Sequence, residues 1–292
     1  MPVKLGRIGV WIPSRALRPG EDRPEQEIAD IVAELAYFGY GALWLGMADG
    51  DLAQVAWLLS RTERIVVATG ITSIWAHPPE KTSAAFAAVS SQYPERVLLG
   101  LGASHRHLVE AMGQRYTRPY QRMVSYLGAL DNATPPVPVH GRALAALGPR
   151  MLRLAGERSA GAHPYLVTPE HTRRAREILG DGPLLAPEQK IVLETDPARA
   201  REIGRRSVSF YLSAPNYLRN LRWLGFTDDD FAGGGSDRLV DALVGWGDAN
   251  AVLARVREHH DAGADHVPIQ VLTPDGSLPR AEWQLLAEVL RG

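Results

Sequence analysis

The stretch from residue 65 to residue 105 constrains the fold of this chain more than any other. It contains two short apolar runs, Ile65–Ile71 and Val97–Leu101, on either side of an alanine-rich segment of helical composition. Because neighbouring positions in each run are apolar, both faces of the two predicted strands are buried, as in a parallel sheet. Two parallel strands need a crossover connection, and the helix between them supplies it. The stretch therefore predicts a βαβ unit.

The same alternation of strand and helix recurs along the chain, which places it in the α/β class. The predicted strands, each followed by a helical region, are 7–12, 42–45, 65–71, 97–101, 142–147, 160–167, 189–194 and 266–272. The fifth of these is alanine-rich, so its composition also suits a helix. Such repeats predict a single (β/α)8 TIM barrel, a fold that typically takes about 250 residues. The domain then spans 1–292, and its extra length lies in the segment 196–247 after strand seven, which we expect to be helical.

A doubly wound open sheet is the alternative that shares these repeats. Its dinucleotide-binding form places a G-x-G-x-x-G motif at the first strand-to-helix turn. No such motif follows the first strand, and Gly100-Leu-Gly102 continues as Ala-Ser-His without the third glycine. The barrel is therefore the preferred fold.

Composition and charge exclude several classes of function. The chain carries 32 Lys and Arg against 33 Asp and Glu, and no basic block interleaves with aromatic residues, so nucleic acid is not an expected partner. Without cysteine, it has no disulfide, no thiolate metal site and no cysteine nucleophile. No uncharged apolar run approaches the ~20 residues of a membrane span, and the N-terminus lacks the apolar core of a signal peptide. We expect a cytoplasmic protein that does not bind membranes.

Small and polar residues follow strands three and four at the point where each strand ends. Thr72-Ser73 follows strand three, and Gly102-Ala-Ser-His105 follows strand four. Trp75, His77 and His107 lie close by in sequence. The carboxyl ends of parallel strands are where ligands bind in barrels, so we expect a site here. Ordinary loops would explain the glycine and serine residues but not the histidines and the tryptophan.

Several other chemistries lack their sequence signals. No H-E-x-x-H or comparable spacing occurs, so no metal site is predicted. Glycoside hydrolysis needs two carboxylates at strand ends, and only Glu194 meets that condition. Neither a G-x-S-x-G nor a P-loop motif is present.

Four motifs, spread in order over the chain, carry a family resemblance. They are Thr69-Gly-Ile-Thr-Ser-Ile-Trp75, Gly100-Leu-Gly-Ala-Ser-His105, Gly148-Pro-Arg-Met-Leu152 and Ala262-Gly-Ala-Asp-His266. With them the chain resembles the luciferase-like monooxygenase superfamily, and within it the actinobacterial oxidoreductases that use the deazaflavin coenzyme F-420. The resemblance implies a barrel that holds a flavin-like ring at its strand ends, usually in a homodimer. It also implies hydride transfer between the coenzyme and a small organic substrate.

The resemblance further implies which residues bind the cofactor. The family has a non-proline cis peptide in strand three behind the ring, and the matching bond here is Ser73–Ile74, with Ile74 as an apolar shelf. Loops after strands four and six bind the cofactor tail and phosphate. For Thr168 a plain helix N-cap is the alternative role. The residues expected to bind the cofactor are Gly46, Ser73, Ile74, Gly102, Ser104, His105, Gly148, Gly161 and Thr168.

One position departs from the family pattern. Members of the superfamily often carry an acid or a histidine at the end of strand two, where this chain has Gly46-Met47. Either Met47 packs on the ring and proton transfer comes from elsewhere, or the protein binds the cofactor without turnover. FMN in place of coenzyme F-420, giving a monooxygenase, is a further alternative because both cofactors share a ribityl phosphate.

Hydride transfer at a deazaflavin needs a dry pocket, good orientation and one proton donor or acceptor. Histidine suits that role near neutral pH, so His77 and His107 are the predicted catalytic residues. The alternative for both is a solvated loop residue or helix cap. Trp11, Met47 and Trp75 are expected to line the substrate pocket.

The aromatic segment Tyr211–Trp246 follows strand seven. In the superfamily such an insertion covers the active site, and a mobile lid that excludes water suits hydride chemistry. A role in dimer packing is the alternative, and the two roles are compatible.

Overall fold

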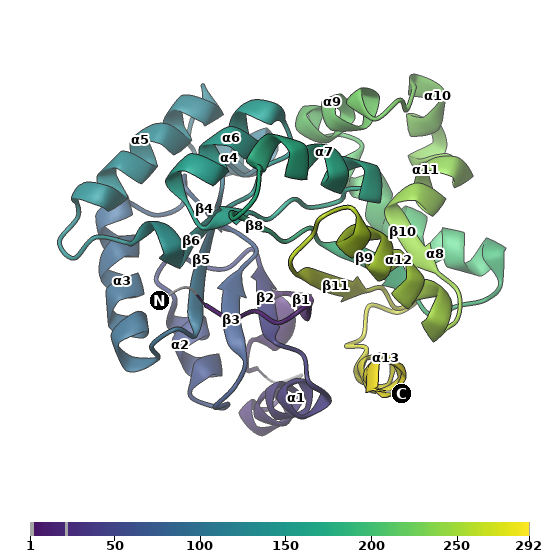
Figure 1. Ribbon diagram of the computed structural model, residues 1–292, viewed down its shortest axis with the longest axis horizontal. Helices are drawn as coiled ribbons and strands as arrows, with labels where there is room; N and C mark the ends of the chain where they lie inside the picture. Colours follow the sequence, from purple (N-terminus) through teal and green to yellow (C-terminus); the bar gives the residue numbers. More distant parts are fainter. Residues whose placement is uncertain (1–2, 21–22, 292) are drawn as a thin grey trace.

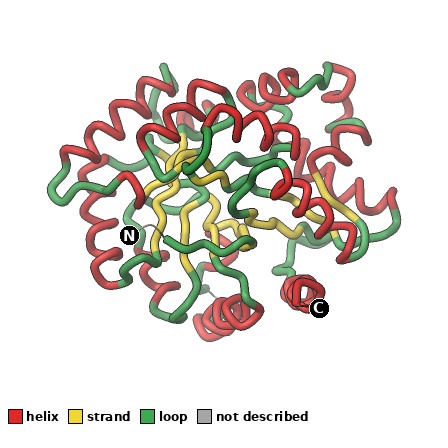
Figure 2. Tube along the Cα trace, viewed as in Figure 1, coloured by secondary structure: helices red, strands yellow, loops and turns green. Residues whose placement is uncertain are grey.

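The chain forms a parallel α/β barrel in the computed structural model, which describes all residues except 1–2, 21–22 and 292 (Figure 1). The outer limits of the predicted domain, Met1 and Gly292, thus lie outside the described residues. The strands gather at the centre of the molecule and the helices surround them (Figure 2). The strands are β1 (Ile8–Pro13), β2 (Ala42–Gly46), β3 (Val66–Thr69), β4 (Thr72–Ser73), β5 (Val97–Gly102), β6 (Arg142–Leu144), β7 (Gly161–Ala162), β8 (Leu184–Leu185), β9 (Gln189–Val192), β10 (Val244–Trp246) and β11 (Val267–Val271).

Many of the helices begin at residues that the sequence marks as helix starts. Proline occupies the first turn of six of them, and Thr168, Asp196, Ser236 and Asp248 cap theirs with side-chain oxygens. The helices are α1 (Glu25–Phe38), α2 (Ala53–Leu59), α3 (Pro79–Gln92), α4 (Arg106–Ala111), α5 (Pro119–Asn132), α6 (Pro149–Arg158), α7 (Pro169–Leu179), α8 (Pro197–Tyr211), α9 (Pro215–Trp223), α10 (Asp228–Phe231), α11 (Asp237–Leu243), α12 (Ala249–Asp261) and α13 (Arg280–Arg291), with short 3-10 turns at Ser14–Leu17, Val139–Gly141 and Ala232–Gly234.

The sheet closes on itself through strand seven. Strands pair in parallel in the order β10-β9-β11-β1-β2-β3-β5-β6-β7-β8, and β4 pairs with β5. Only the residues 186–188 separate β8 from β9, so one continuous segment pairs with β7 at its start and with β11 at its end. The N–H groups of Ala186 and Glu188 continue the ladder by donating to Ala162 and Pro164 carbonyls at 2.9 Å. The segment 184–192 is therefore the seventh strand of a closed eight-stranded barrel.

The predicted fold is confirmed, including the alanine-rich fifth strand, which is the strand β6 and not a helix. Two details differ from the prediction. The segment 196–247 is not wholly helical, because Val244–Trp246 forms β10 and pairs with β9. Strand three also differs from the continuous run predicted over residues 65–71, since it is interrupted between β3 and β4.

The interior of the barrel near its amino ends is filled by aromatic and imidazole rings. The indole N–H of Trp44 donates to Nε2 of His266 at 3.0 Å, and Nδ1 of His266 lies 2.8 Å from the Gly6 carbonyl. The ring of His163 stacks on Trp44 with 4.1 Å between centroids. These contacts give His266 a structural role, and the rings form a packed layer below the carboxyl end of the barrel.

Helices α8 to α11 form a separate layer beside the carboxyl ends of the strands (Figure 1). Their apolar side chains make a hydrophobic cluster of their own, which includes Tyr217, Leu221 and Leu239. The cluster also takes in Leu166 after β7 and Val192 of β9. The insertion is therefore packed directly on the loops that surround the barrel mouth.

Candidate active site

A cavity of about 310 Å³ opens at the carboxyl ends of the barrel strands. It lies over Trp11 of β1, the residues between β3 and β4, and the end of β5. The loops after β6 and β7 and the start of α9 complete its walls. The position agrees with the sequence-based expectation of a site at this rim.

The floor of the cavity forms where strand three is interrupted. The peptide bond Gly70–Ile71 is cis, and Ile71 lines the cavity. The prediction of a cis bond at Ser73–Ile74 is therefore wrong by three residues, and Ile74 is a fully buried core residue and not a shelf. The motif contains two isoleucines three residues apart, each preceded by a small residue, so the sequence pattern alone does not separate them.

Two glycines leave room for the side chains of the floor. A Cβ atom at Gly102 would lie 2.6 Å from Cγ1 of Ile71, and one at Gly46 would lie 2.1 Å from the ring of Trp11. Trp11 is anchored there because its indole N–H donates to the Gly70 carbonyl at 3.2 Å. Gly102 lines the cavity, whereas Gly46 lies behind Trp11, so its role is to admit that ring.

His163 lies beneath the cavity and is almost completely buried. Its Nδ1 atom is 2.7 Å from the Ala186 carbonyl and therefore carries the proton. Burial lowers the pKa of His163 to about 4, so the ring is neutral at physiological pH. Its Nε2 atom has no partner among the described residues and presents a free acceptor to the cavity floor.

The mouth of the cavity is built from residues after β2 and β5. Ser104 and His105 line it, as does the predicted wall residue Met47. Met47 and Ser104 both have left-handed backbone conformations, with φ of 59° and 57°, which L-residues adopt rarely. Burial lowers the pKa of His105, and His107 stacks beside it with 5.9 Å between ring centroids. His107 is exposed and does not line the cavity.

Several predicted site residues support the cavity from outside it. The indole N–H of Trp75 donates to the Ala103 carbonyl at 2.9 Å, and its ring packs on Tyr116 of the cavity wall. Ser73 accepts a hydrogen bond from the Trp75 backbone. His77 packs on Gly50 in the loop after β2 and does not reach the cavity.

Three further residues predicted to bind the cofactor lie in different places. Gly161 begins β7 and does not line the cavity. A Cβ at this position would lie 1.9 Å from the Leu184 carbonyl oxygen. Thr168 caps α7 by accepting from the His171 backbone N–H, and it does not line the cavity. Gly148, the residue before α6, does line it, so the start of that helix faces the cavity.

A group of tyrosines lines the cavity and was not anticipated as a site. Tyr165 follows β7, Tyr211 is the last residue of α8, and Tyr217 lies in the first turn of α9. The hydroxyl groups of Tyr165 and Tyr211 lie 2.9 Å apart, and their rings pack at 5.3 Å. Burial raises the pKa of Tyr211 to about 12 and that of Tyr217 well above its usual value, so both remain protonated.

A fully buried ion pair lies behind these tyrosines. Nζ of Lys190 in β9 is 2.9 Å from Oε1 of Glu188, and neither side chain is exposed. The sequence carried a signal for it, since two charged residues beside or within a strand of a buried sheet are rare unless they are paired. Of the two, only Lys190 falls within the predicted strand 189–194, and neither is among the predicted site residues.

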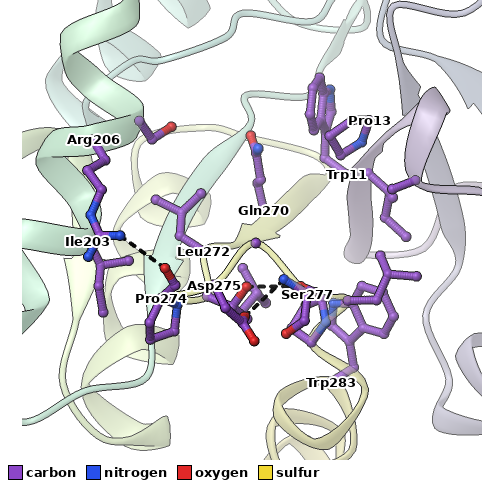
Figure 3. A pocket seen from close by; sticks show the side chains of 18 of the residues that line it. Trp11, Pro13, Ile203, Arg206, Gln270, Leu272, Pro274, Asp275, Ser277 and Trp283 are labelled. Carbon is purple, nitrogen blue, oxygen red and sulfur yellow. Dashed lines mark hydrogen bonds between the residues drawn. The ribbon is translucent and has the colours of Figure 1, made fainter. Parts of the chain in front are cut away.

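A second, larger cavity of about 520 Å³ adjoins the first and shares Trp11 with it. It lies between the end of β1, helix α8 and the loop that follows β11 (Figure 3). Gln270 stands between Trp11 and the Arg206 side of this cavity in Figure 3. Arg206 is held there by a 3.0 Å hydrogen bond to the Pro274 carbonyl.

Among the residues that the structure describes, no three or more histidine, aspartate or glutamate side chains are grouped so that they could bind a metal ion. Within the same residues, no helix combines the length and apolarity that crossing a bilayer requires.

Comparison with known proteins agrees with the fold. Two coenzyme F-420-dependent enzymes of known structure match 98% of this chain and 98% of their own: a secondary alcohol dehydrogenase bound to an F-420–acetone adduct, with a TM-score of 0.74 at 15% identity, and the tetrahydromethanopterin reductase of Methanopyrus kandleri, with a TM-score of 0.75 at 16% identity. The oxygenating component of 3,6-diketocamphane monooxygenase from Pseudomonas putida, in complex with FMN, has a TM-score of 0.63 at 15% identity and covers 97% of this chain and 96% of its own.

A Mycobacterium tuberculosis protein that carries the name coenzyme F-420-dependent oxidoreductase is 30% identical over 180 residues. That match covers 59% of this chain but only 48% of the relative, so the chain spans about half of the protein it matches. The model of the luciferase-like monooxygenase family matches residues 6–182.

The closed barrel with a cavity at the carboxyl ends of its strands is a TIM barrel with a candidate site at its ligand-binding edge. Because the family model matches more than half of its length, the chain belongs to the luciferase-like monooxygenase family.

Proposed function

We propose that this protein is an oxidoreductase that moves a hydride between coenzyme F-420 and a small organic substrate. The observation that carries the proposal is the cavity, in which an apolar shelf at Ile71 and a wall of protonated tyrosines lie at the ligand-binding edge of the barrel. Hydride transfer asks the protein for orientation and exclusion of water more than for charged catalytic groups. The names of the M. tuberculosis relative and of two structural neighbours support the same cofactor.

The residues present suit a flat ring with an anionic tail. Ile71 would contact the face of the ring, since the missing side chain at Gly102 leaves room for Ile71 on the cavity floor. Gly148 at the start of α6 would offer backbone N–H groups to a phosphate. Arg219 of α9 also lines the cavity and would add a positive charge. When bound, the deazaflavin supplies or accepts the hydride, and the protein positions it and keeps water away.

FMN with oxygen is the main alternative, because one structural neighbour binds FMN and the phosphate-binding features serve either cofactor. A barrel that binds the cofactor without turnover is the other alternative, because Met47 stands where an acid or histidine would act. A homodimer also remains a prediction.

The test is fluorescence titration of the purified protein with coenzyme F-420 and, separately, with FMN. We expect saturable binding of the deazaflavin at micromolar or lower concentration and weaker binding of FMN. Preference for FMN would favour a monooxygenase. Binding of neither cofactor would overturn the proposal. After binding is established, reduction of a panel of aldehydes and ketones by the reduced coenzyme would separate an active enzyme from an inactive barrel.

A further inference from the structure

The three protons of the buried Lys190 ammonium group are all directed at acceptors. Nζ lies 2.9 Å from Oε1 of Glu188, 2.7 Å from the hydroxyl of Tyr165 and 2.8 Å from Oε1 of Gln270. A lysine ammonium group has three donors and no acceptor, so Tyr165 must accept a hydrogen bond from Lys190. The second oxygen of Glu188 accepts from the Leu166 backbone N–H at 3.2 Å, which fixes the carboxylate.

The hydroxyl of Tyr165 also has one proton of its own to donate, and Oε1 of Gln270 is one acceptor for it, at 2.9 Å. Tyr211 lies within reach at 2.9 Å, and either hydroxyl can be the donor of that pair. When Tyr165 donates to Tyr211, the proton of Tyr211 is released towards the cavity that both residues line. The result is a chain of hydrogen bonds from a buried cation, through two hydroxyl groups, to the cavity.

Three other ionisable groups of the cavity are less suited to give a proton. Nδ1–H of His163 is committed to the Ala186 carbonyl, so this ring can only accept. The hydroxyl of Tyr116 points to the Ser104 carbonyl. Tyr217 packs on Tyr211 with 5.1 Å between ring centroids but has no cation behind it. Tyr165 and Tyr211 are both half-buried at the cavity and linked to Lys190, Tyr165 directly and Tyr211 through Tyr165. The Tyr165 hydroxyl already contacts Lys190, Gln270 and Tyr211, which leaves Tyr211 as the one of the two whose hydroxyl can turn to a substrate.

We propose that Tyr211 is the catalytic acid of the reaction, and that Tyr165 and Lys190 are positioning residues that stabilise its deprotonated form. This inference rests on the proposed function. In the reducing direction a hydride from the reduced deazaflavin forms the new C–H bond of a carbonyl substrate. The carbonyl oxygen takes the proton as the O–H bond of Tyr211 breaks, which gives the alcohol and a tyrosinate. Tyr165 donates to that tyrosinate while it accepts from Lys190, and water that enters after product release restores the proton.

The arrangement also accounts for the missing acid at strand two. Met47 lies at the mouth of the cavity and cannot transfer a proton. Tyr165 and Tyr211 lie in the opposite part of the cavity wall, which is built by the loop after β7 and by the α8–α9 insertion. The substrate carbonyl would therefore lie beneath Tyr211, and the aromatic insertion contributes a catalytic group as well as a cover.

The kinetic test compares Tyr211→Phe with the wild type, using the reduced coenzyme and a carbonyl substrate found in the panel. We expect kcat to fall at least 100-fold in Tyr211→Phe, as is typical when a general acid is lost, with deazaflavin affinity within twofold of the wild type. Tyr165→Phe should lower kcat about tenfold and leave KM unchanged, because the remaining hydroxyl still reaches the substrate. Tyr126→Phe, which removes a tyrosine hydroxyl bonded to Thr82 far from the cavity, is the matched control.

A second measurement uses the free protein and does not depend on activity. Tyrosine labelled with ¹³C at Cζ reports the hydrogen bonding of each hydroxyl by NMR, and the Tyr→Phe variants assign the signals. Lys190→Met should shift the signals of both Tyr165 and Tyr211 and leave that of Tyr126 unchanged. If removal of the lysine prevents folding by leaving Glu188 unpaired, the double variant Lys190→Met with Glu188→Gln removes both charges and makes the same prediction.

The outcomes separate the two proposals. A wild-type protein that binds no deazaflavin, or reduces no substrate, overturns the proposed function and this inference with it. Turnover that survives in Tyr211→Phe, or that is lost in Tyr217→Phe and not in Tyr211→Phe, overturns the inference alone. A Tyr211 signal that does not respond to loss of Lys190 shows that the cation does not reach the cavity, and it also overturns the inference.

Discussion

Gly102 allows the side chain of Ile71 to occupy the cavity floor, because glycine has no Cβ atom. A Cβ at this position would lie 2.6 Å from Cγ1 and 2.7 Å from Cδ1 of Ile71, closer than such atoms normally approach. Ile71 would have to move off the floor, where the ring face is proposed to lie. We therefore expect Gly102→Ala to weaken deazaflavin binding at least tenfold, measured by fluorescence titration.

The matched control for this substitution is Gly128→Ala. Gly128 lies inside α5, and no atom lies within 4 Å of where its Cβ would be. Alanine in a helix interior is favoured over glycine by about 1 kcal/mol, so this variant should bind the coenzyme normally and melt at a slightly higher temperature. Unchanged affinity in Gly102→Ala would show that the ring does not rest on this part of the floor.

At the scale of elements, Thr168 at the start of α7 has two possible roles, helix N-cap and cofactor ligand. Its hydroxyl oxygen accepts from the His171 N–H at 3.2 Å, the geometry of an N-cap. Loss of such a cap costs about 1 kcal/mol of stability. We expect Thr168→Ala to be destabilised by that amount in urea denaturation and to keep its deazaflavin affinity, while Thr168→Ser keeps both. A tenfold loss of affinity with unchanged stability would instead identify Thr168 as a cofactor ligand.

The elements could be predicted from the sequence because apolar runs alternate with capped helices along the chain. The short strand β10 could not, since Val244-Gly-Trp246 is too brief for a periodic pattern and is a strand only because β9 lies beside it. The non-proline cis bond of strand three was expected from the family resemblance, but its position was not. Both Gly70–Ile71 and Ser73–Ile74 match the pattern of a small residue before isoleucine.

The candidate site could be predicted only in part, for a similar reason. Gly102, Ser104 and His105 follow one strand directly, so their place at the rim follows from the topology. Tyr165 and Tyr211 are 46 positions apart, and their hydroxyl groups meet only because the end of α8 packs against the loop after β7. Spacing along a sequence contains no information about such a contact.

At the scale of the whole molecule, buried neutral histidines link stability to pH. Burial is the main cause that lowers the pKa of each, to about 4 in two of them and about 3 in the other two. The hydrogen bonds of His266 require the neutral ring, because Nε2 accepts from the indole N–H of Trp44 while Nδ1–H donates to the Gly6 carbonyl. The four are His163, His171, His259 and His266.

The sign of the pH dependence follows from proton binding. In the unfolded chain a histidine takes up its proton near pH 6.5, whereas these rings stay neutral in the folded protein until the pH approaches 3 or 4. Below about pH 6.5 the unfolded state therefore holds more protons, and the free energy of unfolding decreases as the pH falls. Above that pH the histidines have no effect. Each contributes a slope of about 1.4 kcal/mol per pH unit in this range.

We predict that the urea midpoint is nearly constant from pH 8 to pH 7 and falls steeply between pH 6 and pH 5. His266→Gln tests the assignment, because a glutamine amide can donate to the Gly6 carbonyl and accept from Trp44 as the imidazole does. In the variant one proton fewer is taken up on unfolding, so the slope of the unfolding free energy against pH should decrease by about 1.4 kcal/mol per pH unit. An unchanged slope would mean that His266 is already protonated in the folded protein near pH 6, and that the ring layer beneath the cavity carries a charge.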